Sequence, residues 1–246
     1  AFYKIIKTDK TGLFAYIAYN DSNAMFAGHL GSNSAVRWSE IRGSATTTVS
    51  GLAYWKDYAF LIGTTAIDVY GPLSTPASSA WTNAWQAVGT STTHPTLIMS
   101  NDILYIGCGN TVASIEQVSG ETFAPADAST YTFSANALDL PTKQTIVSMD
   151  QLGSYLYAAT SDGTKSKIYP WDTFSSSFEE PIRMDGNTID ALFSTNNRMY
   201  VFCGDAGQIY VTTGAVVELA AQIPMTVGDN QDSSYDKKFK IYPDAI

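Results

Sequence analysis

The stretch NDILYIGCGN (residues 101–110) has a counterpart in NNRMYVFCGD (residues 196–205), and this match decides the fold. In both stretches a hydrophobic residue precedes Tyr, two further residues follow, and Cys-Gly comes next in the same register. Tyr105 and Tyr200 are 95 residues apart, and so are Cys108 and Cys203, the two cysteines of the chain. A match over that distance indicates an internal repeat, and a repeat decides how the rest of the chain is interpreted.

The repeat has a period of about 45 residues. Its most regular part is a short apolar run that ends in a small residue and then Thr, Cys or Tyr. The runs are AYIAY (15–19), FLIGT (60–64), LYIGC (104–108), LYAAT (156–160) and MYVFC (199–203). Taking Ala18, Gly63, Gly107, Ala159 and Phe202 as anchors, the spacings are 45, 44, 52 and 43 residues. This period is typical of a four-stranded propeller blade with its turns.

The segments around each run complete the blade. A short apolar segment and a polar turn precede the run, an alternating segment follows it, and a more variable fourth segment ends the unit. No window shows a 3.6-residue period, so we expect almost no helix. The sequence therefore predicts an all-β protein, a β-propeller of four-stranded antiparallel blades with five blades readable. Fourth strands, which vary most, are expected at the outside.

The end of the chain fits the repeat less well. Residues 1–225 are predicted to form the propeller, and residues 226–246 an acidic linker plus a strand-like segment, KFKIYPDAI. This segment either closes the ring or begins a further blade of a six-bladed ring. Because the chain begins at Ala1 and ends just after that segment, we expect it to be part of a longer polypeptide.

The two cysteines are predicted to be free and buried. Both fall on the second strands of their units, in blades that are not neighbours. Packed sheets are about 10 Å apart, whereas a disulfide needs Cα atoms within about 7 Å. Free cysteine is one of the most frequently buried residue types.

Composition excludes several classes of partner. Hydrophobic residues make up 45% of the chain, enough for a core, and charged residues only 15%, against about 25% in typical soluble domains. The net charge is −9 and the four arginines do not cluster, so nucleic acid and anionic membranes are poor candidates. No apolar run approaches the ~20 residues of a membrane span.

Enzymatic and metal sites have weak signals. A sialidase needs clustered arginines, but Arg37, Arg42 and Arg183 fall on outer strands and Arg198 at a turn. SDGTKS (161–166) is only a faint match to a sialidase Asp-box, and YPWD (169–172) is interpreted as turn packing. Neither histidine has partners at metal-ligand spacing, and Asp229, Asp232 and Asp236 lack the calcium-loop pattern. We therefore expect no catalytic residue, metal or cofactor.

The loops after the second strands, together with the connections between blades, share one rim of a propeller, where ligands commonly bind. The residues in these loops that could contact a partner protein or a glycan are Asp21, Asn110, Asp162, Lys165 and Asp205. The alternative is that Asp and Asn at these places simply form the turns. Long insertions on the opposite rim, residues 71–80 and 119–129, are plausible protein-contact surfaces.

The order of segments resembles a known group of proteins. GLAYWKDYAFLIGTTAIDVYGPL, LYIGCGNTVASIEQV, IYPWD, MYVFCG and IYPDAI are similar to segments of propeller proteins encoded by tailed bacteriophages. The resemblance covers most of the chain and implies a virion component of the tail, baseplate or fibre. It brings no catalytic residues with it.

From the resemblance and the composition we expect a non-enzymatic structural or adhesion module in a virion. Its expected partners are other virion proteins in an oligomeric assembly, and a glycan of the host surface. The alternative is a secreted carbohydrate-binding propeller, and an enzyme ranks third.

Overall fold

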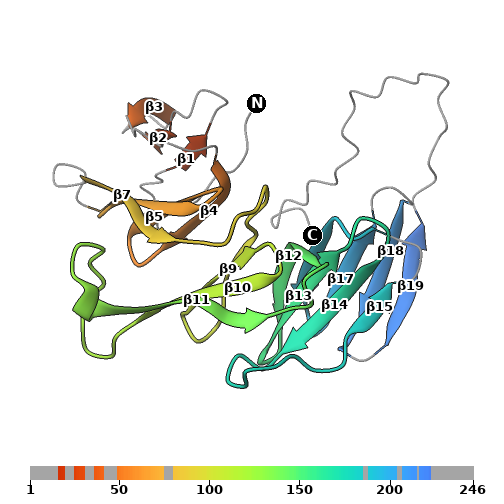
Figure 1. Ribbon diagram of the computed structural model, residues 1–246. Coiled ribbons are helices and arrows are strands. Elements are labelled where there is room, and N and C mark those ends of the chain that lie inside the picture. Colours follow the sequence, from red (N-terminus) through yellow and green to blue (C-terminus); the bar gives the residue numbers. More distant parts are fainter. Residues whose placement is uncertain are drawn as a thin grey trace. The chain divides into compact units, whose positions relative to one another are not determined.

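A computed structural model describes residues 49–74, 80–184, 188–203, 207–214 and 216–222 with their side chains, and residues 16–19, 25–30 and 36–41 as backbone. The chain divides into two compact units, Ala1–Asn136 and Ala137–Ile246. Each unit consists of antiparallel sheets (Figure 1). The predicted linker and last strand, within residues 226–246, lie outside the described residues.

The first sheet of unit 1 has three described strands in the order β1-β2-β3. These strands are β1 (Tyr16–Tyr19), β2 (Met25–Leu30) and β3 (Val36–Ile41). Ala18 lies on β1, as the repeat places it. The strand expected before it, within residues 2–9, lies outside the described residues.

Unit 1 also contains two four-stranded sheets, each in sequential order. The strands of the earlier sheet are β4 (Val49–Trp55), β5 (Tyr58–Gly63), β6 (Ala66–Gly71) and β7 (Ala80–Ala87). Those of the later sheet are β8 (Thr96–Ile98), β9 (Leu104–Cys108), β10 (Thr111–Gln117) and β11 (Tyr131–Asp139). A single 3-10 turn, η2 (Ala128–Thr130), precedes β11.

Unit 2 repeats the pattern with two further four-stranded sheets. The strands of the earlier sheet are β12 (Thr145–Leu152), β13 (Tyr155–Ser161), β14 (Ser166–Trp171) and β15 (Ile182–Met184). Those of the later sheet are β16 (Ala191–Thr195), β17 (Arg198–Cys203), β18 (Gln208–Thr212) and β19 (Val217–Gln222). The repeat anchors thus fall on equivalent second strands.

Short turns join the first and second strands. Lys56 and Asp57 connect β4 to β5 with φ values of 50° and 69°, and Asn196 and Asn197 connect β16 to β17 with 49° and 60°. Two consecutive residues with positive φ form the hairpin turn that matches the twist of the strands, and Asn and Asp tolerate this conformation best. The polar turn before each apolar run is therefore what sets the hairpin.

Burial follows strand position within each unit. Every residue of β9 is buried, and β5 and β13 are buried over nearly their whole length. By contrast, β19 is exposed from Glu218 to Gln222. A strand buried on both faces needs a neighbour on each side, as in a blade whose second strand is interior and whose fourth strand is outermost.

Hydrogen bonds between successive sheets recur at the repeat spacing. In unit 1 the Thr96 hydroxyl donates to the Leu52 carbonyl, and in unit 2 the Leu192 amide donates to Ser148 Oγ; the partners are 44 residues apart in both pairs. At the turns of unit 1, Trp55 Nε1 donates to Asp102 across 47 residues. Equivalent strands of neighbouring sheets therefore lie side by side, as packed blades require.

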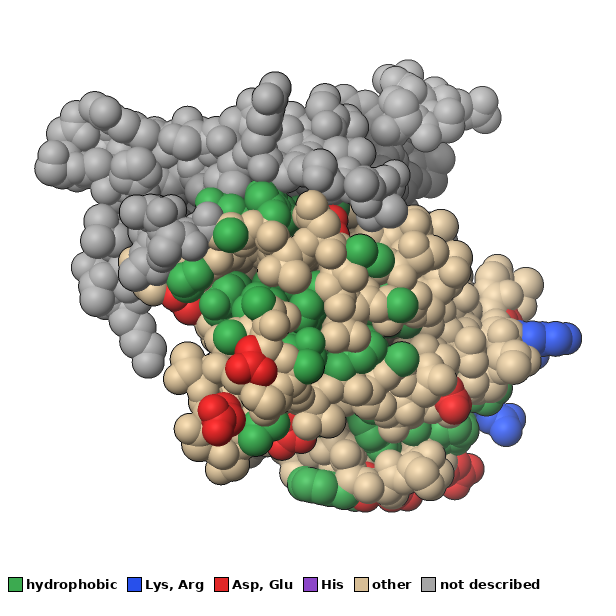
Figure 2. Space-filling view, turned by 60° about the vertical axis from the view of Figure 1, so that its left-hand side comes forward, with side chains coloured by type: hydrophobic (Ala, Val, Ile, Leu, Met, Phe, Trp, Pro, Cys, Tyr) green, Lys and Arg blue, Asp and Glu red, His purple; other side chains and the backbone are tan. Residues whose placement is uncertain are grey.

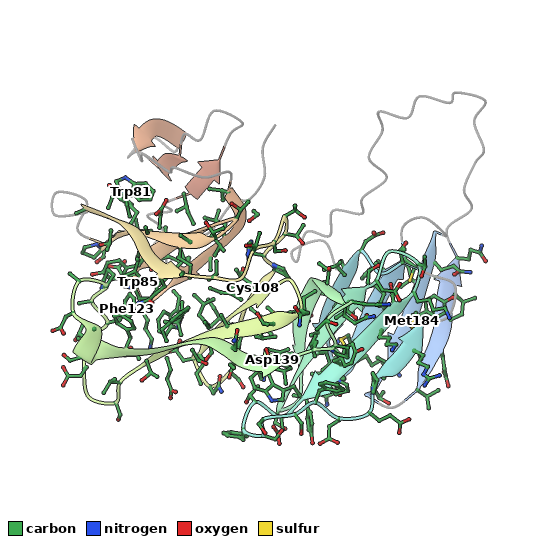
Figure 3. The ribbon with its side chains drawn as sticks, in the orientation of Figure 1. Trp81, Trp85, Cys108, Phe123, Asp139 and Met184 are labelled. Atoms are coloured by element: carbon green, nitrogen blue, oxygen red, sulfur yellow. The ribbon has the colours of Figure 1, made fainter. Side chains whose placement is uncertain are left out.

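The insertion at residues 118–130 packs inward. Phe123 is 3% exposed and lies 5.8 Å from Trp85 between ring centroids (Figure 3). Trp85 Nε1 donates to the Pro125 carbonyl, and Thr130 Oγ1 accepts the Ala124 amide. Burying an aromatic ring stabilises by about 1.5–3 kcal/mol, so this long loop completes the core of unit 1.

The predicted fold class is confirmed: the described residues form four sheets of four antiparallel strands and one sheet of three, with a 3-10 turn as the helical element. The prediction for the thiols is confirmed as well. Cys108 and Cys203 are free, lie on β9 and β17, and are 3% and 1% exposed.

Candidate functional site

Asp162 and Lys165 lie together in the β13–β14 turn of unit 2. One carboxylate oxygen of Asp162 accepts hydrogen bonds from the amides of Thr164 and Lys165 and from the Thr164 hydroxyl, at 2.7–2.9 Å. These bonds, the backbone amides above all, lower the pKa of Asp162 to about 2. The Asp162 carboxylate therefore stabilises the turn. This agrees with the alternative that Asp and Asn in these loops form turns and do not bind a partner.

The other predicted binding residues lie in unit 1 or outside the described residues. Asn110 lies in the β9–β10 turn of unit 1, after Gly109, whose φ is 63°. Asp21 and Asp205 lie outside the described residues. Asp162 and Lys165 are thus the pair of predicted binding residues that the described structure places in one loop.

YPWD ends strand β14 and packs against the turn that follows it, as interpreted from the sequence. Asp172 Oδ1 accepts the amides of Phe174 and Ser175, and Trp171 Nε1 donates to the Ser175 carbonyl at 2.8 Å. Trp171 is 2% exposed. The motif fixes the start of the β14–β15 loop, residues 172–181.

A serine–histidine pair joins the two four-stranded sheets of unit 1. Ser50 Oγ lies 2.6 Å from His94 Nδ1, and His94 Nε2 lies 3.1 Å from the Gly89 carbonyl. Because a carbonyl only accepts, Nε2 carries the hydrogen and Nδ1 accepts from the Ser50 hydroxyl. Burial lowers the pKa of His94, and its bond to Gly89 partly offsets that effect.

This arrangement has the connectivity of an activated nucleophile, in which a histidine held by a third group takes the serine proton. Its surroundings favour a structural role instead. His94 is 2% exposed, and its backbone amide also donates to the Ser50 carbonyl. The partners are 44 residues apart, the spacing of the bonds at Thr96 and Ser148 that only join blades.

The two thiols are unreactive in this structure. Burial raises the pKa of Cys108 to about 11, although the amides of Gly89 and Ala113 oppose the shift. Burial and the negative charge of Asp190 raise the pKa of Cys203 to about 11. Since the thiolate is the nucleophile, neither cysteine is suited to covalent catalysis at neutral pH.

Unit 2 carries a groove of about 810 Å³ between its two four-stranded sheets. Tyr155 and Tyr157, two apart on β13, lie on one face of that strand, with ring centroids 6.4 Å apart. The groove is also lined by Pro170, by the end of the β14–β15 loop, by β15 and by the β18–β19 turn. We call it the β13–β15 groove.

Two backbone features shape the groove. The Glu179 amide donates to the Pro170 carbonyl at 2.8 Å, which holds the loop against β14. Gly214, with φ 120°, faces Tyr157, whose hydroxyl oxygen would be only 2.8 Å from a Cβ at that position. Glycine there leaves room for the tyrosine hydroxyl.

Charges of both signs border the groove. Glu179, Glu180 and Arg183 line it with exposed side chains, and none of the residues that the structure describes forms an ion pair with them. Arg183 lies on the fourth strand of its sheet, as predicted. The groove itself was not predicted, although FEEPIRM (178–184) is the segment in which two acids, a proline and an arginine come together.

Other kinds of site find little support in the described part of the chain. It contains no group of three or more His, Cys, Asp or Glu side chains that could hold a metal ion; Asp229, Asp232 and Asp236 lie outside it. None of its helical segments has the length and apolar character needed to cross a bilayer. On the face seen in Figure 2, charged side chains are scattered among neutral ones.

No protein-family model matches the sequence, and no curated protein matches it. Solved structures do. The β-propeller domain of Myceliophteria thermophila Cps50 (Swd1) is 8% identical with a TM-score of 0.60, and the match covers 82% of this chain and 67% of that domain. A candidate 6-phosphogluconolactonase from Bacteroides fragilis is 15% identical with a TM-score of 0.56, covering 87% and 68%.

Kluyveromyces lactis Hsv2 is also similar, with 9% identity and a TM-score of 0.52 over 85% of this chain and 61% of Hsv2. The chain thus spans about two thirds of the length of each of these three structures. Together with the repeated four-stranded sheets, the matches define it as a β-propeller protein. At such low identities they show the fold alone.

Proposed function

We propose that this chain is a non-enzymatic structural and adhesion module of a bacteriophage particle, and that it contacts other virion proteins in an oligomeric assembly through its loop rims. The proposal is supported by the similarity of its segments to phage propeller proteins and by its low content of charged residues, 15%. None of the three similar solved structures is a phage protein, so the match in fold does not bear on the particle.

The observation that carries the contact role is the position of Phe174. Its side chain is 88% exposed, at the tip of the β14–β15 loop. Asp172 accepts the Phe174 amide at 2.9 Å, and Thr173 has a φ of 69°, so the backbone on either side of the ring is held in a turn. Single exposed apolar side chains are common on protein surfaces. What favours an anchor here is that the backbone of a large ring is already held in a turn, so a partner buries the ring at a small cost in entropy.

The buried chemistry of the described residues supports a non-enzymatic role. The Ser50–His94 pair is enclosed between two sheets. Both thiols have raised pKa values. His94 and both thiols lie in the packed interior of their units.

The particle itself provides the test. Purified virions from the phage that encodes this chain should contain it at fixed symmetry positions in electron micrographs, and its gene should lie beside portal, terminase or tail genes. Absence of the chain from purified particles would overturn the proposal.

The Phe174→Ala variant tests the anchor. It should fold normally and enter particles at least about ten-fold less, since interface aromatics contribute about 2 kcal/mol or more. Ser176→Ala changes an exposed neighbour in the same loop and should enter normally. Equal incorporation of both variants would show that Phe174 is not the anchor.

A further inference from the structure

The β13–β15 groove indicates that the folded chain binds a ligand, whether or not the chain is part of a virion. It lies within unit 2, and none of its lining residues is among those that the sequence predicted for binding. Its volume of about 810 Å³ is within the range of small-molecule sites, roughly 300–1,000 Å³. The chemistry of its walls narrows the class of ligand.

The two tyrosines provide an amphipathic wall. Tyr155 is half-buried and Tyr157 is 6% exposed, and both pack against the core of unit 2. The Tyr155 ring, tilted by 54° from that of Tyr157, offers the apolar surface, whereas Tyr157 is almost wholly buried and adds only a small part of its side chain to the groove. Such side chains suit a ligand that has both apolar faces and hydroxyl groups.

Charges of both signs at the groove disfavour a ligand that carries charge of one sign only. Glu179 and Glu180 repel phosphate, sulfate and carboxylate groups, and Arg183 repels cations. Carboxylates only accept hydrogen bonds and guanidinium only donates them. A neutral polyhydroxyl compound can bond to the carboxylates and to the guanidinium group, because each of its hydroxyls both donates and accepts a hydrogen bond.

An extended peptide fits the groove poorly. A peptide that adds to a sheet edge needs free backbone donors and acceptors. At the edge of β14, Pro170 has no N–H, and its carbonyl already accepts from Glu179. Two residues before Pro170, Ile168 of β14 already pairs with Ile182 of β15, so the edge of β14 is occupied there.

We therefore propose that the β13–β15 groove binds a neutral oligosaccharide. A pyranose C–H face packs against Tyr155, the sugar hydroxyls donate to Glu179 and Glu180, and Arg183 donates to the sugar oxygens. The inference goes beyond the proposed function because it requires only the folded chain, and it holds for a secreted protein as well as for a virion component.

The test is a glycan array probed with the whole chain, followed by titration calorimetry with the neutral oligosaccharide that gives the highest signal. We expect neutral glycans to bind with a Kd of about 1 mM or tighter. Sialylated and sulfated forms of the same glycans should bind less well, since the two glutamates repel them. A panel of basic, proline-containing peptides is tested in parallel.

Three variants locate the site. Tyr155→Ala and Glu180→Gln should each weaken binding about ten-fold, equivalent to about 1.4 kcal/mol. Lys143→Ala, at an exposed side chain between β11 and β12, should leave it unchanged. Because Tyr155 also packs against the core, Glu180→Gln, at an exposed side chain, separates loss of binding from loss of folding.

Three results would overturn the inference: no neutral glycan bound on the array, affinity unchanged in Glu180→Gln, or tighter binding of the peptides than of any glycan. None of them would bear on whether the chain is part of a particle, which the analysis of virions decides separately.

Discussion

Ser148 Oγ on β12 accepts the backbone amide of Leu192 on β16 at 3.0 Å. The two residues are 44 apart in the sequence and lie on the first strands of successive sheets. Thr96 and Leu52 form an equivalent bond in unit 1 with the same separation. Residues that form hydrogen bonds between successive sheets are therefore separated in the sequence by about one repeat period.

Replacing Ser148 with Ala should lower the free energy of unfolding by about 1–2 kcal/mol, because the Leu192 amide loses its acceptor in a partly buried place. Urea denaturation measures the change. Ser154→Ala, at an exposed turn, is the matched control and should stay within about 0.5 kcal/mol of the wild type. Equal stability of the two variants would show that the bond contributes nothing.

Gly51→Ala should destabilise unit 1 by about 1–3 kcal/mol, as overpacking does. A Cβ at Gly51 would lie 2.8 Å from His94 Cβ and would press on the His94 backbone carbonyl. Gly153→Ala meets no atom within 4 Å and is strained only by its φ of 62°. In NMR spectra the His94 ring signals should shift in the first variant and not in the second; unshifted signals in Gly51→Ala would contradict the packing.

His94 should titrate below its ordinary pKa of 6.5, because burial disfavours the imidazolium form. A depressed pKa in the folded state means that the neutral ring stabilises the fold fully above pH 6.5, and that this contribution declines as the pH falls toward the folded pKa. An NMR titration of the ring measures the midpoint. A midpoint at or above 6.5 would show that the ring is open to water.

The two thiols should react slowly with Ellman's reagent in the native protein. With pKa values of about 11, only about one thiol in a thousand is ionised at pH 8, and both are buried. Unfolding in urea should release both at once. Ser154→Cys places a thiol at an exposed turn and should react immediately; equally fast reaction of the native cysteines would contradict their burial.

The carboxyl of Asp162 should titrate near pH 2, well below its ordinary 3.8, because two backbone amides and the Thr164 hydroxyl donate to it. Its contribution to stability is present above 3.8 and is lost as the pH falls through about 2. In Thr164→Ala, which lacks the hydroxyl, the midpoint measured by carbon-detected NMR should rise. A midpoint of 3.8 in the wild type would mean that the turn is open.

The fold was predictable because its signals are local. Alternating and continuous apolar runs, with turn residues between them, identify strands without knowledge of their neighbours. Gly107 and Ala159 therefore fall on the expected second strands, β9 and β13. The same register placed Cys108 and Cys203 in the interior.

No local sequence pattern identifies the binding residues in the way that apolar runs identify strands. Asp162 is a turn residue in the sequence and a turn residue in the structure, because the signal for binding and the signal for a turn consist of the same amino acids. The insertion at 119–129 was expected to be a contact surface; most of it is exposed and it also buries Phe123, so that expectation stays a prediction. A sequence pattern shows that a loop is long, and does not show which way its apolar residue turns.

The period, the strand order within each blade and the burial of the cysteines follow from residues close together along the chain. The Ser50–His94 pair and the groove at Tyr155, Glu180 and Arg183 exist only once sheets pack against each other. Ser50 and His94 are 44 residues apart, and Tyr155 is 25 residues from Glu180, with no pattern that links them. Which side chains meet there depends on the packing between strands, and the local pattern of a strand does not contain that information.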